Sequence, residues 1–368
     1  MMLLMTTACS SSDDEEGQEK HAMLAVYVYA PEPAAGAQKN AVRRRADEPN
    51  VDVISAAEQE IKRLQLWIYE HGTGNYVGYL DTVEVTSLNT GKEALYQIPV
   101  SDEFAAVKPE VDVFVQANVK AENCGVGTLD KNTTCEALMS GAKIEGHFGL
   151  GNRQKSVPAQ GLPMAGKLTM QPVVGDAPAL RVGSMNAVST VQLIRAVSKL
   201  RFVFAKSEGQ PTVSITSIKI NIGMIPEVEY LFDETQDLTY NTSAGELLSS
   251  AIDDIAETAD PTQYMYVDQE AQEYEDLINE AESKKEVTVE GPIYLRESDK
   301  LLEGTIYYTI DGGDVESVNF VMQQEGDFSR NHTWIVYAYY AGTGGLQVQS
   351  LYVKDWSGKE MSHSFYNW

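Results

Sequence analysis

Apolar side chains recur at every second position in short stretches along much of this chain. Between residues 23 and 29, Leu24, Val26 and Val28 fall on one face of an extended strand and larger side chains fall on the other. A period of two residues is typical of strands with one buried face. The same alternation, or a short apolar run, predicts further strands over 64–69, 76–80, 94–100, 111–119, 167–171, 191–204, 213–222, 287–295, 305–310, 317–323, 333–341 and 346–353.

Turn sequences separate these stretches. Residues 311–313 (Asp-Gly-Gly) and 342–345 (Gly-Thr-Gly-Gly) each lie between two predicted strands, where glycine permits a tight hairpin turn. Many short strands joined by such turns are typical of β-sandwiches rather than of a parallel sheet. Helix is expected in two places only, 246–258 and 269–283.

One acidic segment interrupts the strand pattern. Residues 251–286 carry 12 Asp and Glu residues against two lysines. Because no calcium-loop spacing is present, we interpret the segment as a solvated insertion on a loop. Tyr264, Tyr266 and Tyr274 within it could line a binding surface, although exposed tyrosines are common in loops.

The composition describes an acidic protein with enough apolar residues to form cores. The 368 residues suffice for about two domains of ordinary size, and 43% of them are hydrophobic. The formal net charge is −26, from 54 acidic and 28 basic residues, so a nucleic acid would be repelled. No run approaches the roughly 18–20 apolar residues that span a bilayer, and we expect a soluble body.

Motifs for catalysis are missing from the sequence. It contains no GxSxG, HExxH, Walker A or strand-to-helix GxGxxG pattern, and its five histidines are scattered singly. The glycine-rich residues 72–78 lie between two predicted strands and indicate a hairpin turn rather than a nucleotide loop. Acidic pairs suited to glycoside hydrolysis cannot be told from accidental pairs among so many carboxylates. We expect no enzyme, no catalytic residue, no cofactor and no metal site.

The chain opens with the sequence MMLLMTTAC, a short apolar stretch ending in Ala8 and Cys9. It resembles a bacterial lipoprotein signal with Cys9 as the lipidated residue, and the serine and acidic run at 10–16 is similar to the surface-export tether of Bacteroidetes lipoproteins. The stretch is shorter than a usual signal peptide, so an ordinary initiator segment is the alternative. In an exported protein, Cys124 and Cys135 either form a local disulfide or remain unpaired thiols in a loop.

A protease site is predicted downstream of the first strand. Arg45 ends a run of three arginines in a linker that contains proline, glycine and alanine. Such an open linker is accessible to a trypsin-like protease, which would cut between Arg45 and Ala46. The cut would release the strand whose buried face is formed by Leu24, Val26 and Val28, and would leave a sheet edge open.

Two stretches resemble the Bacteroidetes fimbrillins, the subunits of type V pili, and a third resembles them more loosely. Residues 328–334 (FSRNHTW), with the strand, glycine turn and Trp356 that follow, are similar to the ending "RNHxY, strand, glycine turn, strand, W" of that family. Residues 195–200 (RAVSKL) are similar to the strand that opens the C-terminal domain of the family, and 293–298 (IYLRES) to a turn. We interpret the RNH stretch as a turn before a strand, which marks the family and performs no chemistry.

The resemblance implies two transthyretin-like Greek-key β-sandwiches in tandem, the second carrying the acidic, partly helical insertion. It divides the chain into a lipoprotein signal and tether (1–21), a propeptide strand removed by proteolysis (22–45), an N-terminal sandwich (46–190), a C-terminal sandwich (191–345) and a donor-strand segment (346–368). It also implies cleavage by an arginine-specific protease, followed by donor-strand exchange, in which the C-terminal strand of the next subunit replaces the released strand.

The C-terminal segment is apolar enough for this role. Its large apolar side chains are Met361, Phe365, Tyr366 and Trp368. Burial of four such groups at roughly 1.5–3 kcal/mol each would hold subunits together durably. The alternative is that 346–368 folds back onto its own domain, as terminal strands often do.

These features together predict a structural subunit of a cell-surface fimbria that supports adhesion and touches the outer membrane only through a transient lipid anchor. Its partners would be other copies of itself, related anchor and tip subunits, the protease, and a receptor on a host or bacterial surface. The alternatives are a fimbrial tip or accessory adhesin, and a stand-alone surface lipoprotein that binds glycan or a host protein.

Overall fold

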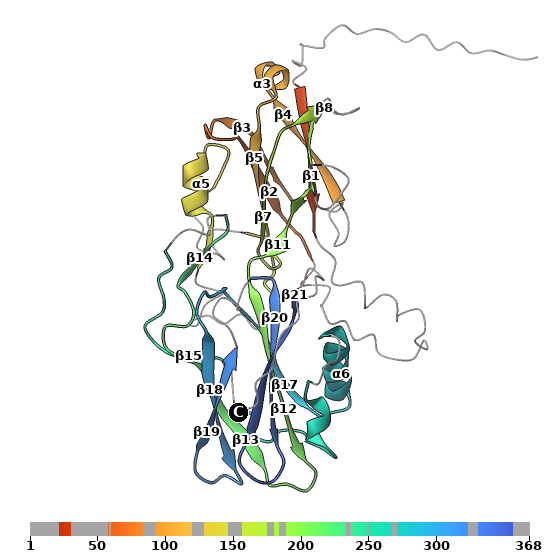
Figure 1. Cartoon of the computed structure of the whole chain (residues 1–368), viewed down its shortest axis with the longest axis vertical. Coiled ribbons are helices and arrows are strands. Elements are labelled where there is room, and N and C mark those ends of the chain that lie inside the picture. Colours follow the sequence, from red (N-terminus) through yellow and green to blue (C-terminus); the bar gives the residue numbers. More distant parts are fainter. Residues whose placement is uncertain are drawn as a thin grey trace, which may run out of the picture.

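The computed structural model of this chain describes residues 22–30, 58, 60–83, 85, 93–119, 129–145, 157–174, 180–183, 189–232, 237–248, 251–266, 271–322 and 330–355. Strands dominate these residues and form two sandwiches stacked along the long axis of the molecule (Figure 1). The all-β sandwich prediction is therefore confirmed, whereas the Greek-key connectivity stays a prediction.

The first sandwich consists of two five-stranded sheets. One has the order β10-β1-β9-β8 with β4 paired to β1, and the other has the order β11-β7-β5-β2-β3. Their apolar inner faces meet in the first core, which contains side chains from β1, β2, β4 and β5. The strands are β1 (Ala22–Tyr29), β2 (Leu64–Glu70), β3 (Tyr76–Thr82), β4 (Glu93–Val100), β5 (Val111–Ala117), β7 (Met164–Met170), β8 (Val173–Val174), β9 (Leu180–Val182), β10 (Val191–Gln192) and β11 (Ile194–Arg195).

The second sandwich pairs a sheet of order β16-β12-β20-β21, with β17 also paired to β12, with a sheet of order β15-β13-β18-β19. The second core lies between them. These strands are β12 (Ser198–Ser207), β13 (Val213–Ile220), β15 (Gly245–Glu246), β16 (Glu257–Thr258), β17 (Thr288–Leu295), β18 (Leu302–Ile310), β19 (Glu316–Met322), β20 (His332–Tyr340) and β21 (Gln347–Asp355).

The two sandwiches meet at a narrow waist. β11 ends at Arg195 and β12 begins at Ser198, so the chain passes from one sandwich to the other within a few residues. A second connection is the two-stranded sheet of β6 (Lys143–Glu145) and β14 (Val228–Tyr230), which joins segments from the two halves of the sequence. A third apolar cluster fills the waist, and in it Phe114 packs edge-to-face against Phe232 with ring centroids 5.1 Å apart.

Several boundaries differ from the sequence prediction. The stretch 191–204 is not one strand but β10, β11 and the start of β12, since the chain changes sandwich within it. The helix expected over 246–258 is wrong. The apolar residues in that segment have helix-like spacing, but they lie along a sheet edge, where Leu247 donates its main-chain N–H to Ile218 and Ile252 bridges to Ile215.

The sequence pattern also missed two short helices, α3 (Asp102–Val107) and α5 (Cys135–Gly141). Both begin with a side-chain cap, because Ser101 accepts from the N–H of Phe104 and Thr134 accepts from the N–H of Ala137. The helix expected over 269–283 is present as α6 (Ala271–Ser283).

The acidic segment is not a solvated insertion, and the prediction was wrong on this point. Its one-turn helix η3 (Pro261–Tyr264) and α6 pack against β12 and β20 in a fourth apolar cluster. Tyr264 and Tyr274 are 2% and 0% exposed, so these two side chains do not form a binding surface. Among the described side chains of the segment, Asp260, Glu280 and Glu282 are exposed, whereas Tyr274, Ile278 and Ala281 are buried against the sheet.

Candidate functional site: the N-terminal strand and the waist

The first strand lies between strands that are distant from it in sequence. β1 pairs antiparallel with β4 along its whole length, from Ala22 opposite Val100 to Tyr29 opposite Glu93. On its other edge it runs parallel to β9 and then to β10. In the part of the chain that the structure describes, β4 has no other partner in this sheet, so β1 is the strand that joins β4 to the rest.

The side chains of β1 fill the first core as the alternation predicted. Leu24, Val26 and Val28 are all 0% exposed and pack between the two sheets. At roughly 1.5–3 kcal/mol for each buried side chain, the three contribute an upper estimate of about 5–9 kcal/mol. A contribution of this size is comparable with the net stability of a whole domain, so the sandwich needs a strand in this position.

The two ends of the groove that β1 occupies have different surroundings. At the Ala22 end, α3 covers the core and inserts Phe104, which is 6% exposed. At the other end, the main-chain carbonyl of Tyr29 accepts a hydrogen bond of 2.8 Å from the N–H of Leu193, close to the waist. β1 therefore runs from the distal end of the first sandwich toward the second sandwich (Figure 1).

The chain returns to the same waist at Glu58, which sequence reasoning had missed. Glu58 is 1% exposed, and its carboxylate lies 3.2 Å from the Lys199 ammonium and accepts from the Tyr294 hydroxyl. Burial raises the pKa of the Tyr294 hydroxyl far above its ordinary value, so this phenol stays a donor. The Glu58 carbonyl also accepts from Arg195 Nε at 3.2 Å. The described residues on either side of the arginine run, Tyr29 and Glu58, thus both bond to residues 193–195 near the waist.

A second buried ion cluster forms around Arg330. Its guanidinium bonds Glu297 at 3.0 Å through Nε and lies 3.3 Å from Glu229. The same group donates to the carbonyls of Tyr230 and Leu231, at 2.9 and 3.3 Å. Burial raises the pKa of Glu229 to about 8, and repulsion by the nearby Glu297 carboxylate adds to the rise, while Arg330 and Arg296 act in the opposite direction.

The three stretches that resembled the fimbrillins therefore converge at the waist. Arg195 and Lys199 come from 195–200, Tyr294 and Glu297 from 293–298, and Arg330 from 328–334. At the waist they bond to Glu58 and to Glu229, and Glu229 lies on β14, the strand that pairs with β6 from the first half of the sequence. The sequence showed the motifs but could not show that they lie close together in the fold, since the three stretches are far apart along the chain.

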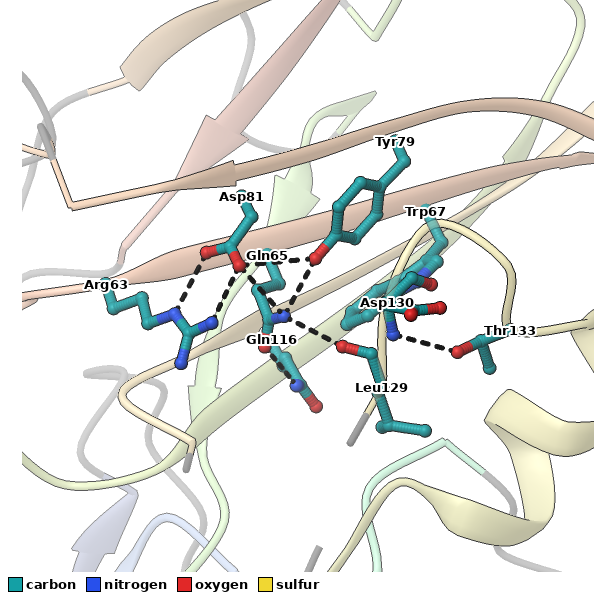
Figure 2. A network of polar contacts seen from close by, with 9 residues as sticks. All are labelled: Arg63, Gln65, Trp67, Tyr79, Asp81, Gln116, Leu129, Asp130 and Thr133. Atoms are coloured by element: carbon teal, nitrogen blue, oxygen red, sulfur yellow. Dashed lines mark hydrogen bonds and ion pairs between the residues drawn. The ribbon is translucent and has the colours of Figure 1, made fainter. Parts of the chain in front are cut away.

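A ladder of side chains on β2 fastens the segment that leads to α5, and Figure 2 shows two of its members, Gln65 and Trp67. Gln65, Trp67 and Tyr69 all point outward from the sheet, and each donates a hydrogen bond to a main-chain carbonyl. The acceptors are the carbonyls of Leu129 at 3.2 Å, Asp130 at 2.9 Å and Thr133 at 2.6 Å. Because these outward residues are covered by the segment, β2 is buried on both faces.

Most of the other predicted site residues lie outside the described residues. These are Cys9, Arg45, Ala46, Cys124, Met361, Phe365, Tyr366 and Trp368. Cys135 is the first residue of α5 and is half-buried, and burial raises the pKa of its thiol. Its pairing with Cys124 and the roles of the others stay predictions.

The first part of the predicted donor segment is held in cis. β21 pairs antiparallel with β20, from Tyr339 opposite Gln347 to His332 opposite Asp355. Residues 347–355 therefore fold back onto their own domain, as the alternative prediction states. The donor residues from Met361 onward lie outside the described residues.

Within the described ranges, no helix is long and apolar enough to cross a membrane. No cluster of three or more His, Cys, Asp and Glu side chains with the arrangement of a metal site occurs among the same residues.

Comparison with solved structures identifies the fold. The chain matches a "putative cell adhesion protein" from Parabacteroides distasonis with a TM-score of 0.52 and 14% identity, over 93% of this chain and 99% of the other. The two proteins share a fold. The tip fimbrial protein Mfa3 and the fimbrial anchor protein Mfa2, both from Porphyromonas gingivalis, match with TM-scores of 0.49 and 0.39. Their identities are 12% and 11%, and the matches cover 89% and 90% of this chain and 99% and 97% of the others.

The fold assignment rests on the first of these structures, whose TM-score exceeds 0.5. No protein-family model matches the sequence, and no curated protein matches it.

Proposed function

We propose that this chain is a non-enzymatic structural subunit of a cell-surface fimbria, which polymerises by donor-strand exchange and supports adhesion. The observation that carries the proposal is the position of β1: a strand whose inner face is fully buried and which precedes an arginine run, with the core depending on it. The description of the Parabacteroides protein of the same fold as an adhesion protein supports the adhesive role.

In this mechanism a protease cuts after Arg45, and the strand bearing Leu24, Val26 and Val28 leaves its groove. The groove then offers unpaired main-chain groups of β4 on one side and of β9 and β10 on the other, with three apolar pockets between them. A donor strand from the next subunit restores both ladders and refills the pockets, as in β-augmentation. Trp368 and the apolar residues before it would supply that strand.

The processing scheme completes the proposal. Export as an outer-membrane lipoprotein precursor would use Cys9 as the lipid attachment site, and removal of residues 1–45 would release the subunit from its transient anchor. The mature chain would begin at Ala46, with sandwiches over 46–190 and 191–345. Other copies of this chain and related anchor and tip subunits are then its partners, together with an arginine-specific protease and a surface receptor.

Limited proteolysis tests this function directly. The chain from residue 21 onward is treated with trypsin, and the products are followed by intact mass and by electrophoresis in SDS without boiling. We expect a cut after Arg45, loss of the β1 peptide and a ladder of SDS-resistant oligomers. Such resistance is expected because a strand paired on both edges and buried in a core separates slowly.

The matched control replaces Lys39 and all three arginines of the run with glutamine, which removes the trypsin sites of this linker and leaves β1 unchanged. This variant should remain a monomer under the same treatment. A wild-type chain that is cut after Arg45 but stays monomeric would contradict polymerisation, and would favour the tip or stand-alone adhesin instead.

A further inference from the structure

The start of the predicted donor segment is fastened to its own sandwich by the acidic segment. We call residues 260–266 and 271–286 the clasp. Gln349 of β21 is 5% exposed, and its side chain binds both main-chain groups of Tyr266 in the clasp. Its Oε1 accepts from the Tyr266 N–H at 3.0 Å, and its Nε2 donates to the Tyr266 carbonyl at 3.2 Å. The amide group of Gln349 thus bonds the main chain of Tyr266 in the way that the main chain of a neighbouring β-strand would, with one bond accepted and one donated.

The clasp itself is anchored on the neighbouring strand β20. The Tyr337 hydroxyl donates to the carbonyl of Pro261 at 2.6 Å, and the Tyr274 hydroxyl donates to the carbonyl of Tyr264 at 2.8 Å. The ring of Tyr264 packs edge-to-face on that of Tyr337, with centroids 6.5 Å apart. Because these hydroxyls and rings are buried, the clasp is a fixed part of the sheet surface rather than a loose loop.

We propose that the clasp keeps β21 in its own sandwich during assembly, so that the strand given to the next subunit lies entirely within residues 356–368. This inference rests on the proposed function and narrows the donor segment of 346–368 to its second half. If β21 left, the N–H and carbonyl of Tyr266 and the whole edge of β20 would lose their partners at a buried surface, which is costly.

The lengths are compatible with this division. The groove holds the eight residues of β1, which at about 3.3 Å per residue span roughly 26 Å. Residues 356–368 number 13 and reach about 43 Å when extended. About five residues are then free to bridge the gap between two subunits.

A covalent staple between β20 and β21 tests the proposal in the full chain. Ala338 and Val348 lie directly opposite each other and face the second core. Opposed residues of antiparallel strands have Cα atoms about 4.5–5.5 Å apart, within the range that a disulfide spans. The double variant Ala338→Cys, Val348→Cys is assembled with trypsin in its oxidised and in its reduced form, and the staple is verified by peptide mass. Samples are reduced only after assembly, so that the ladders report strand exchange.

We expect the oxidised and reduced forms to assemble to the same extent, within about twofold. Assembly of the reduced form alone would overturn the proposal, because β21 would then have to leave its sandwich, while the donor-strand mechanism itself would stand. Failure of the wild-type chain to assemble would instead refute the proposed function, and this inference with it.

A second measurement does not depend on how the double variant folds. In Gln349→Ala, hydrogen exchange of the β21 main-chain amides should accelerate about tenfold or more relative to wild type. The matched control is Gln347→Ala, an exposed glutamine on the same strand, which should change exchange less than twofold. Equal exchange in the two variants would show that the clasp does not hold β21, and would overturn the proposal.

Discussion

The substitution Val26→Ala separates the role of β1 before cleavage from its role after it. Val26 lies at the centre of β1, is 0% exposed, and pairs with Tyr96 on one side and Val182 on the other. In the uncut chain its side chain belongs to the first core. In a donor-strand polymer β1 has gone, so the same substitution should be absent from the assembled state.

The magnitude follows from the buried surface. Val→Ala removes the equivalent of two methylene groups, about 1.6 kcal/mol of transfer free energy, and leaves a small cavity that raises the cost to about 2–3 kcal/mol. At about 1.4 kcal/mol for each factor of ten, 2 kcal/mol corresponds to roughly a 30-fold change in the equilibrium for losing β1. We therefore expect the cut Val26→Ala chain to release its strand up to roughly 30 times faster than the cut wild type.

Three readouts check this expectation. The urea midpoint of the uncut variant should fall in proportion to a loss of about 2–3 kcal/mol. The rate of oligomer formation after trypsin cleavage should rise, because release of β1 precedes donor entry. The thermal resistance of the finished ladder should equal that of wild type, since the substituted residue is no longer present.

The control is Met23→Ala, a partly exposed residue on the opposite face of the same strand. It should change stability by about 0.5 kcal/mol or less and leave the assembly rate near that of wild type. One outcome would refute the reasoning: Val26→Ala destabilises the uncut chain, but the assembly rate stays the same or falls. β1 would then not be the strand that assembly displaces.

Three further predictions concern the waist and the β2 ladder. Glu58→Gln leaves a buried lysine without its carboxylate and should cost about 3–5 kcal/mol in urea unfolding, against about 0.5 kcal/mol or less for the exposed Glu60→Gln; equal costs would show that the waist pair does not join the sandwiches. The folded-state pKa of Glu229, about 8, exceeds its ordinary 4.5, so the folded protein holds a proton that the unfolded chain has released between these values, and the stability contributed by this group falls as pH rises through that window. Glu229→Gln should therefore gain stability relative to wild type between about pH 5 and pH 8, and a pH-independent difference in unfolding free energy would contradict the raised pKa. Tyr69→Phe removes one buried hydroxyl from the ladder and should lower the unfolding free energy by about 1–2 kcal/mol, whereas Tyr76→Phe, at an exposed side chain, should not change it measurably.

The strand pattern was largely legible in the sequence because one-sided burial imposes a two-residue period on each strand. β4 alternates buried with exposed side chains along most of its length, and β18 alternates buried with partly buried side chains. The same rule placed Leu24, Val26 and Val28 on the buried face of β1. It failed in the segment 246–258, where residues dock one by one along a sheet edge and no regular period is enforced. It also failed to foresee α3 and α5, whose single buried apolar residues, Phe104 and Leu138, are too few to set a helical pattern.

The sequence by itself determined the class of fold, the strand that precedes the arginine run and the absence of known catalytic motifs, because all of these depend on neighbouring residues. Only the tertiary structure decided that β1 occupies the centre of a sheet, since its partners β4, β9 and β10 come from distant parts of the chain. The same holds for Glu58 at the waist and for Gln349 against the clasp. Long-range pairing is set by which buried surfaces and ions complement one another in three dimensions, and a local period carries no information about it.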